Sequence, residues 1–264
     1  MSEAQPPVFR RLILELAPGP ADARAMRRAA EFARDFGLDL HGVYVEDEAL
    51  LNLSGFSFAR EIRLPTNDWR KLDATGLADE LRQQAEAARL LLRRLLDQMG
   101  LRGGFEVRRG DPMVCVAGVC SPADIVVVSG AMRARAPQRD PLRHAAALAP
   151  ASVLVMPERP APQGGTIVVL TDRSDDPGVA LAARIAADRH APLLILTPDD
   201  QAEPGWAGAV ECRSIPSLRA DDLLRALTQV RERLVIITHG AAAITGMEGA
   251  ARVAATTLVP VLVL

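Results

Sequence analysis

The chain has 264 residues, of which 49% are hydrophobic and 3% aromatic, and its formal net charge is −2. This length exceeds a usual single domain of about 100–200 residues and allows two modest domains with aliphatic cores. The small net charge argues against a nucleic acid or an anionic membrane as a partner held by bulk electrostatics. Lys71 is the only lysine, so the Gly-x-x-x-x-Gly-Lys sequence of a P-loop is absent.

The N-terminal residues lack the basic and apolar regions of a signal peptide. The apolar runs are also shorter than the roughly 18 residues that a membrane helix needs. The three cysteines Cys115, Cys120 and Cys212 show no metal-ligand or Cys-x-x-Cys spacing. We therefore expect a cytoplasmic protein with reduced thiols, no metal site and no membrane partner, in which Cys115 and Cys120 are small core residues.

The first half alternates strand and helix patterns. A helix is expected to open at Asp22, and two more are expected over residues 76–99 and 112–120. Residues 49–71 show no clear period, which indicates an irregular excursion with room for one short helix. Short apolar runs predict strands at residues 11–16, 40–45, 105–108, 125–128 and 152–156.

A linker rich in proline and glycine over residues 159–165 precedes a second, shorter series of elements. Asp176 followed by Pro177 is typical of a helix start, and a further helix is expected over residues 221–231. Strands are predicted at residues 166–171, 192–196, 210–215, 234–237 and 261–264.

The two halves end in similar patterns. An apolar run and a glycine at residues 234–240 are followed by Arg252 with alanines and by the final run at 259–264. The first half repeats this arrangement with a run at residues 125–130, Arg143 with alanines, and a run at 153–157. Continuous β-branched runs suit strands that are buried on both faces of a parallel sheet. The chain is therefore expected to contain two related α/β domains, residues 1–160 with an insertion at about 49–100, and residues 161–264.

Several local sequences resemble universal stress protein domains. Residues 167–174 resemble the opening strand of that family, which ends in an aspartate followed by a small polar residue. Residues 41–46 resemble its second strand, and residues 109–112 resemble the exit of its third strand. The resemblance implies two doubly wound, five-stranded parallel sheets in tandem. It also implies pairing of the two domains within the chain or a homodimer, commonly through the fifth strands.

Members of this family that bind ATP hold it at the carboxyl ends of the first and fourth strands, through a Gly-x-x-Gly, nine-residue, Gly-Ser/Thr loop. In the second half Gly240 matches the second glycine, whereas Ile237 occupies the place of the first. Eight residues separate Gly240 from Gly249, and Ala250 replaces the hydroxyl residue. The resemblance thus implies one imperfect adenine-nucleotide site, with Mg²⁺ entering only with the nucleotide. Its expected residues are Asp172, Ser174, Gly240, Gly246 and Gly249.

Each of these positions also has a plainer interpretation. Asp172 and Ser174 suit a simple turn after a strand, and the glycines suit a flexible loop and a helix start. Arg133, Arg135 and Arg139 in the first half could bind an anion or form a solvated loop. His239 could contact a ligand or only occupy the loop.

No catalytic residue is identified, because neither a Gly-x-Ser-x-Gly motif nor a general base is found. The favoured hypothesis is a non-catalytic stress-response regulator or sensor with one adenine-nucleotide site. One alternative is a scaffold with degenerate sites that acts through protein partners. The other is a weak ATP hydrolase. The sequence names neither the stress nor the partner.

Overall fold

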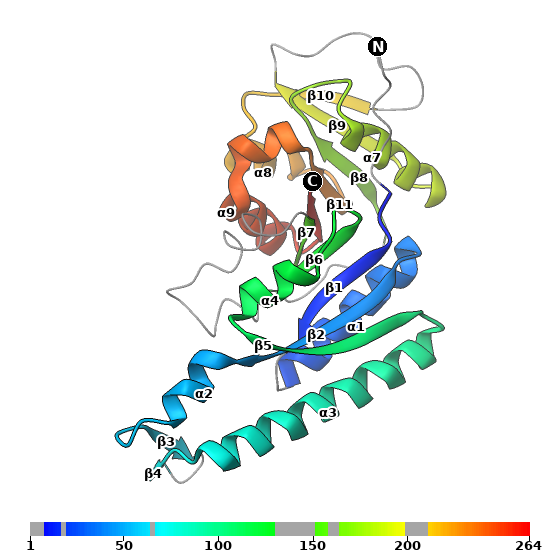
Figure 1. Ribbon diagram of the computed structural model, residues 1–264. Coiled ribbons are helices and arrows are strands. Elements are labelled where there is room, and N and C mark those ends of the chain that lie inside the picture. The colour runs from blue at the N-terminus through cyan, green and yellow to red at the C-terminus, as the bar shows by residue number, and fades with distance from the viewer. Residues whose placement is uncertain (1–7, 17–19, 64–66, 130–150, 158–163, 199–210) are drawn as a thin grey trace. The chain divides into compact units, whose positions relative to one another are not determined.

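The computed structural model describes residues 8–16, 20–63, 67–129, 151–157, 164–198 and 211–264. These residues form two compact units, an N-terminal unit of Arg10–Cys120 and a C-terminal unit that contains Ser121–Leu264. Figure 1 shows the elements of both units. The two units divide after Cys120, whereas the sequence predicts a domain boundary near residue 160. The last two strands of the first half therefore belong to the C-terminal unit.

The N-terminal unit contains a parallel sheet with the strand order β1-β2-β5. Two long helices, α1 and α3, contact each other and pack on this sheet. Gly42 of β2 lies where α3 crosses closely, because a Cβ there would come within 2.7 Å of both Leu16 and Leu92 side chains. The elements are β1 (Arg11–Leu16), α1 (Pro20–Phe36), β2 (Asp39–Asp47), α3 (Ala74–Met99), β5 (Gly103–Gly110) and α4 (Pro112–Val119).

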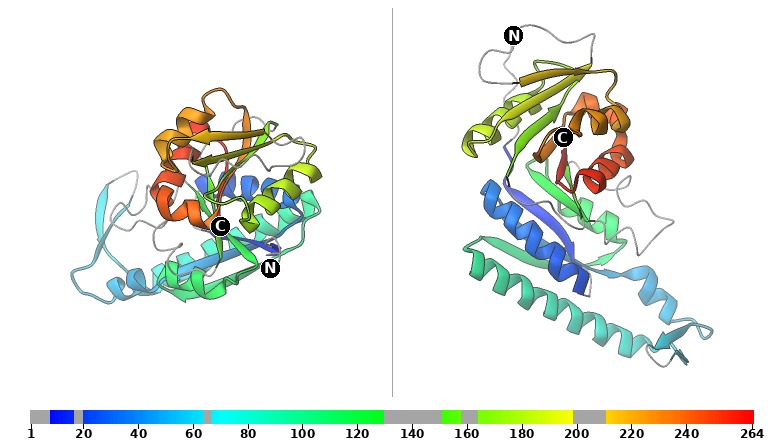
Figure 2. Two further views of the ribbon diagram at one scale, coloured as in Figure 1. Left: turned by 90° about the horizontal axis from the view of Figure 1, so that it is seen from above. Right: turned by 180° about the vertical axis from the view of Figure 1, so that it is seen from behind.

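The segment between β2 and α3 is more regular than the sequence indicates. It contains α2 (Glu48–Ser54) and an antiparallel hairpin of β3 (Arg60–Arg63) and β4 (Asp68–Lys71). The expectation of one short helix is confirmed, but the expectation of otherwise irregular chain is wrong. In the three views, α2 and the hairpin extend past the end of β2, beside the start of α3 (Figures 1 and 2). We refer to residues 48–73 as the arm.

The C-terminal unit contains a sheet with the order β10-β9-β8-β11-β12-β7-β6. Its neighbouring strands are parallel except for β12 and β7, which pair antiparallel with Val261 opposite Val155. The strands are β6 (Asp124–Ser129), β7 (Ser152–Met156), β8 (Thr166–Leu170), β9 (Leu193–Pro198), β10 (Glu211–Ile215), β11 (Glu232–Ile237) and β12 (Val261–Val263). The helices among the described residues of this unit are α7 (Pro177–Asp188), α8 (Ala220–Leu227) and α9 (His239–Thr257).

The five strands of the second half are arranged as β10-β9-β8-β11-β12, so the first strand lies at the centre of the series. This agrees with the predicted doubly wound parallel sheet. The helix start at Asp176 is confirmed, because its carboxylate accepts a hydrogen bond of 2.7 Å from the Gly178 amide. The helix predicted to reach residue 231 instead ends at Leu227, since a turn from Leu227 to Val230 leads directly into β11.

The core of each unit is aliphatic, as the composition predicts. The fully buried side chains include Leu12, Ile13 and Leu92 in one unit and Ile167, Leu170 and Leu194 in the other. Among the helices that the structure describes, none has the length and apolar character needed to cross a membrane.

Candidate functional site

The candidate site lies where β8 and β11 end side by side in the C-terminal unit. The amide of Thr238 donates to the Leu170 carbonyl oxygen at 3.0 Å, and its hydroxyl lies 3.3 Å from that of Thr171. Both threonines are fully buried. These contacts fix the positions at which Asp172 leaves β8 and α9 begins after β11. The carboxyl ends of central strands in such a sheet are the usual place for a ligand.

Asp172 and Gly240 are brought together at this point. A Cβ built on Gly240 would lie 2.2 Å from each carboxylate oxygen of Asp172, so the carboxylate occupies the space that any other residue at 240 would fill. The Oδ1 atom of Asp172 is buried, and no described group forms a hydrogen bond with it. A buried acceptor without a donor is costly, which makes this atom the clearest ligand-directed feature of the site.

Ser174 lies in an exposed turn beyond Asp172. Thr171 holds the start of this turn, since its hydroxyl donates to the Arg173 carbonyl at 2.7 Å and accepts from the Arg173 amide at 3.1 Å. Arg173 in turn forms two hydrogen bonds with Asp175, and these bonds hold the pKa of the Asp175 carboxyl below its usual value. Asp172 is half-buried at the start of this turn, with its Oδ1 atom buried, whereas Arg173, Ser174 and Asp175 are exposed.

Helix α9 begins at once after β11, with Thr238 as its N-cap residue. The Ala242 amide already donates to the Thr238 carbonyl at 2.8 Å, so this stretch is helix where a phosphate-binding loop would be open chain. The helix is broken at Gly246, whose φ of 68° and ψ of 163° are not helical. Such a backbone conformation is available essentially only to glycine.

Gly246 and Gly249 lie six and nine residues after Gly240 in the chain, at and beyond the break in α9. Gly249 serves a packing contact, because a Cβ there would lie 3.0 Å from Thr245 and 3.3 Å from Ala220. Thr245 itself donates to the Leu218 carbonyl at 2.6 Å. The structure thus unites Asp172 with Gly240, whereas Gly246 and Gly249 shape the break in α9 and its contact with α8.

The other sequence candidates are placed as follows. His239 is exposed in the first turn of α9. Arg133, Arg135 and Arg139 lie outside the described residues. Cys115 and Cys120 are half-buried, and burial is the main cause that raises the pKa of the Cys115 thiol. In the described part of the chain, no group of three or more His, Cys, Asp or Glu side chains could hold a metal ion.

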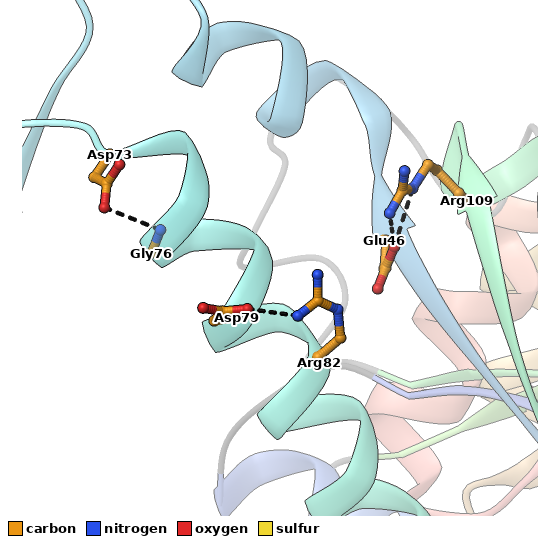
Figure 3. Close-up of polar contacts among 6 residues, drawn as sticks. All are labelled: Glu46, Asp73, Gly76, Asp79, Arg82 and Arg109. Atoms are coloured by element: carbon orange, nitrogen blue, oxygen red, sulfur yellow. Dashed lines mark hydrogen bonds and ion pairs between the residues drawn. The ribbon is translucent and has the colours of Figure 1, made fainter.

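An ion pair in the N-terminal unit was not anticipated. Arg109 of β5 donates to one oxygen of Glu46 from Nε at 3.0 Å and from Nη2 at 2.7 Å, and the Glu46 side chain is 10% exposed (Figure 3). The strand register sets Glu46 directly opposite Arg109. Opposite charges at the ends of two predicted strands were the available signal, but the register that joins them is a tertiary feature.

Comparison with known proteins identifies the fold. No protein-family model and no curated protein matches the chain. A universal stress protein from Archaeoglobus fulgidus DSM 4304 is similar in structure, with a TM-score of 0.69 and 11% identity over 97% of each chain. A functionally unknown protein from Pseudomonas aeruginosa PAO1 gives a TM-score of 0.54 at 16% identity, over 97% of this chain and 92% of that one. A candidate universal stress protein from Pseudomonas aeruginosa UCBPP-PA14 gives 0.54 at 16% identity, over 97% and 93%. The chain therefore has the α/β fold of the universal stress proteins.

Proposed function

We propose that this protein is a cytoplasmic, non-catalytic sensor or regulator of a stress response that binds one adenine nucleotide beside Asp172. The observation that carries the proposal is the buried Asp172 Oδ1, which has no hydrogen-bond partner among the described groups. It lies at the carboxyl end of β8, beside the end of β11. A hydroxyl or amine of a bound nucleoside would supply the missing donor.

The nucleoside part of such a ligand fits the site better than a triphosphate. The Asp172 carboxylate packs on Gly240 at the start of α9, where it would repel a phosphate that approached the same helix end. Helical hydrogen bonds such as that from Ala242 also occupy backbone amides in this stretch. We therefore assign sugar or base recognition to Asp172. Ser174, Gly246 and Gly249 are the proposed contacts for the phosphates of a bound nucleotide. Mg²⁺ would bind only together with these phosphates.

Two further functions are kept as alternatives. A weak ATP hydrolase would need a general base beside the phosphates, and the exposed His239 in the first turn of α9 is the candidate for that role. A scaffold that acts through protein partners would need no ligand at all. The antiparallel register of β7 and β12 supports pairing of the two halves within one chain, and a homodimer is the alternative arrangement.

Calorimetric titration with adenosine, AMP and ATP, each with and without Mg²⁺, tests the proposal. The variants are Asp172→Asn, and Asp172→Ala combined with Gly240→Val. Asp172→Asn keeps the shape of the side chain but loses the charge, so affinity should fall about tenfold or more, as expected for one charged hydrogen bond. Asp175→Asn is the matched control, because Asp175 is an exposed carboxylate three residues away that pairs with Arg173.

Adenosine or AMP binding that requires Asp172 but not Asp175 supports the sensor. The absence of binding by all three ligands at millimolar concentration would contradict it and favour the scaffold. Phosphate release from bound ATP would instead indicate the hydrolase.

A further inference from the structure

The arm presents a ribbon with two different faces. In the β3–β4 register, Arg60 lies opposite Lys71, Glu61 opposite Arg70, and Ile62 opposite Trp69. Since alternate residues of a strand share a face, Arg60, Ile62, Trp69 and Lys71 lie together on one side. We call these four residues the basic apolar face. Glu61 and Arg70 lie on the other side.

The two faces differ in charge. Glu61 and Arg70 are opposite charges in register, which is favourable across a strand pair. On the basic apolar face, two cations stand opposite each other, which is unfavourable by the same rule. Within the described residues, neither Arg60 nor Lys71 forms an ion pair. This face therefore carries two positive charges that the described part of the chain does not neutralise.

The same face carries apolar side chains that are left in solvent. Trp69 is 64% exposed and Ile62 is 49% exposed. The chain that leads into β3 adds the stacked rings of Phe56 and Phe58, whose centroids lie 5.2 Å apart. All four residues of β4 are exposed. An isolated two-stranded hairpin is only marginally stable in water, and it is usually stabilised by a third strand or by packing of one face.

We propose that an edge of the hairpin pairs with an extended acidic segment of a protein partner, which adds a strand and places every second side chain of the segment on the basic apolar face. Such a segment would place an acidic and an apolar side chain two residues apart, toward Lys71 or Arg60 and toward Trp69 or Ile62. Strand addition supplies backbone hydrogen bonds, while alternate side chains supply the specificity. This proposal is independent of the Asp172 site.

Charge distribution favours an acidic peptide over a nucleic acid or an anionic membrane. A phosphate backbone or a lipid surface acts through many charges at once. The face offers two cations, the hairpin sequence also contains Glu61 and Asp68 together with Arg63 and Arg70, and the whole chain has a net charge of −2. A pair of local carboxylates matches two local cations, whereas an extended anionic surface would also meet these acidic groups.

The test uses the full chain and a fluorescein-labelled peptide of eight residues, in which glutamate and valine alternate at every second position with threonine between them. A peptide with glutamine in place of glutamate is its control. Fluorescence anisotropy should show binding of the glutamate peptide that weakens as salt is added. R60Q combined with K71Q, and separately W69A, should each weaken binding at least about tenfold.

R70Q is the matched control, because Arg70 lies in β4 with Trp69 and Lys71 but on the opposite face. The affinity of this variant for the glutamate peptide should stay within about twofold of the wild type. Circular dichroism of each variant checks that the chain remains folded. Failure of the glutamate peptide to bind would overturn the proposal, as would equal binding of the glutamine peptide. Preferred binding of oligo-dT or of phosphatidylserine vesicles through the same residues would also overturn it. So would a dimer that W69A converts to monomer, because the face would then be covered by a second copy.

Discussion

At the residue scale, the contact between Asp172 and Gly240 gives a structural reason for a glycine at position 240. The sequence suggests that Gly240 lets the backbone approach a phosphate. In the structure its missing side chain makes room for a carboxylate, since a Cβ would lie 2.2 Å from both oxygens. The contact with Asp172 thus gives a second reason for a glycine at this position, beside the ligand that the sequence suggests.

The contact predicts a strong coupling between the two positions. Gly240→Ala should lower the free energy of unfolding by about 1–3 kcal/mol, because the carboxylate must move out of a tight space. In an Asp172→Ala background the same change should cost about nothing, since alanine is the better helix former. Urea unfolding of the four proteins measures this cycle. Equal costs in the two backgrounds would show that the contact is not the cause.

Tyr44 offers a second test, because it is the only tyrosine of the chain. Its side chain is 1% exposed, and its hydroxyl donates to Gln84 Oε1 at 3.3 Å. Burial, and secondly the nearby charge of Glu46, raise the pKa of Tyr44. Absorbance at 295 nm should therefore show phenolate formation above the ordinary value of about 10 in the folded protein, and near that value in guanidinium.

The raised pKa of Tyr44 has a defined effect on stability. Above about pH 10 the unfolded chain loses the phenolic proton while the folded chain keeps it, so stability falls as pH rises through this window. Below that window Tyr44 is protonated in both states and adds nothing to the pH dependence of stability. Tyr44→Phe should remove this part of the slope, as measured by urea unfolding at several pH values. A slope unchanged in the variant would contradict the assignment.

At the element scale, α9 depends on one glycine for its break. Gly246→Ala should destabilise the C-terminal unit by about 1–3 kcal/mol, because the φ of 68° and ψ of 163° suit glycine alone. Gly118→Ala is the control: the residue is in helix α4, and apart from its chain neighbours and the helix's own backbone no atom lies within 4 Å of the added Cβ. It should be neutral or stabilising by about 0.5–1 kcal/mol. Thermal unfolding distinguishes the two variants, and similar melting temperatures would contradict the prediction.

At the scale of the whole molecule, the final strand lies inside a sheet rather than at its edge. β12 lies between β11 and β7, and its three residues are buried. The predicted second domain, residues 161–264, lacks β6 and β7. Without them the apolar β12 becomes an edge strand, which is a template for pairing with another chain.

Residues 161–264 expressed alone should therefore self-associate, whereas residues 121–264, which retain β6 and β7, should do so less. Sedimentation velocity over a range of concentrations measures the difference. A monomeric, cooperatively folded 161–264 fragment would support the boundary near residue 160 and contradict the dependence of β12 on β7.

The order of most elements could be predicted from the sequence, because continuous β-branched runs and the Asp176–Pro177 helix start encode burial and capping locally. It did not reveal β3 and β4, since four-residue strands with exposed side chains carry no periodic burial signal. Three contacts became visible only in the folded chain: the antiparallel pairing of β12 with β7, the ion pair of Glu46 with Arg109, and the packing of Asp172 against Gly240. Each of these contacts joins residues far apart in the chain, so its existence depends on strand register and packing rather than on any local pattern.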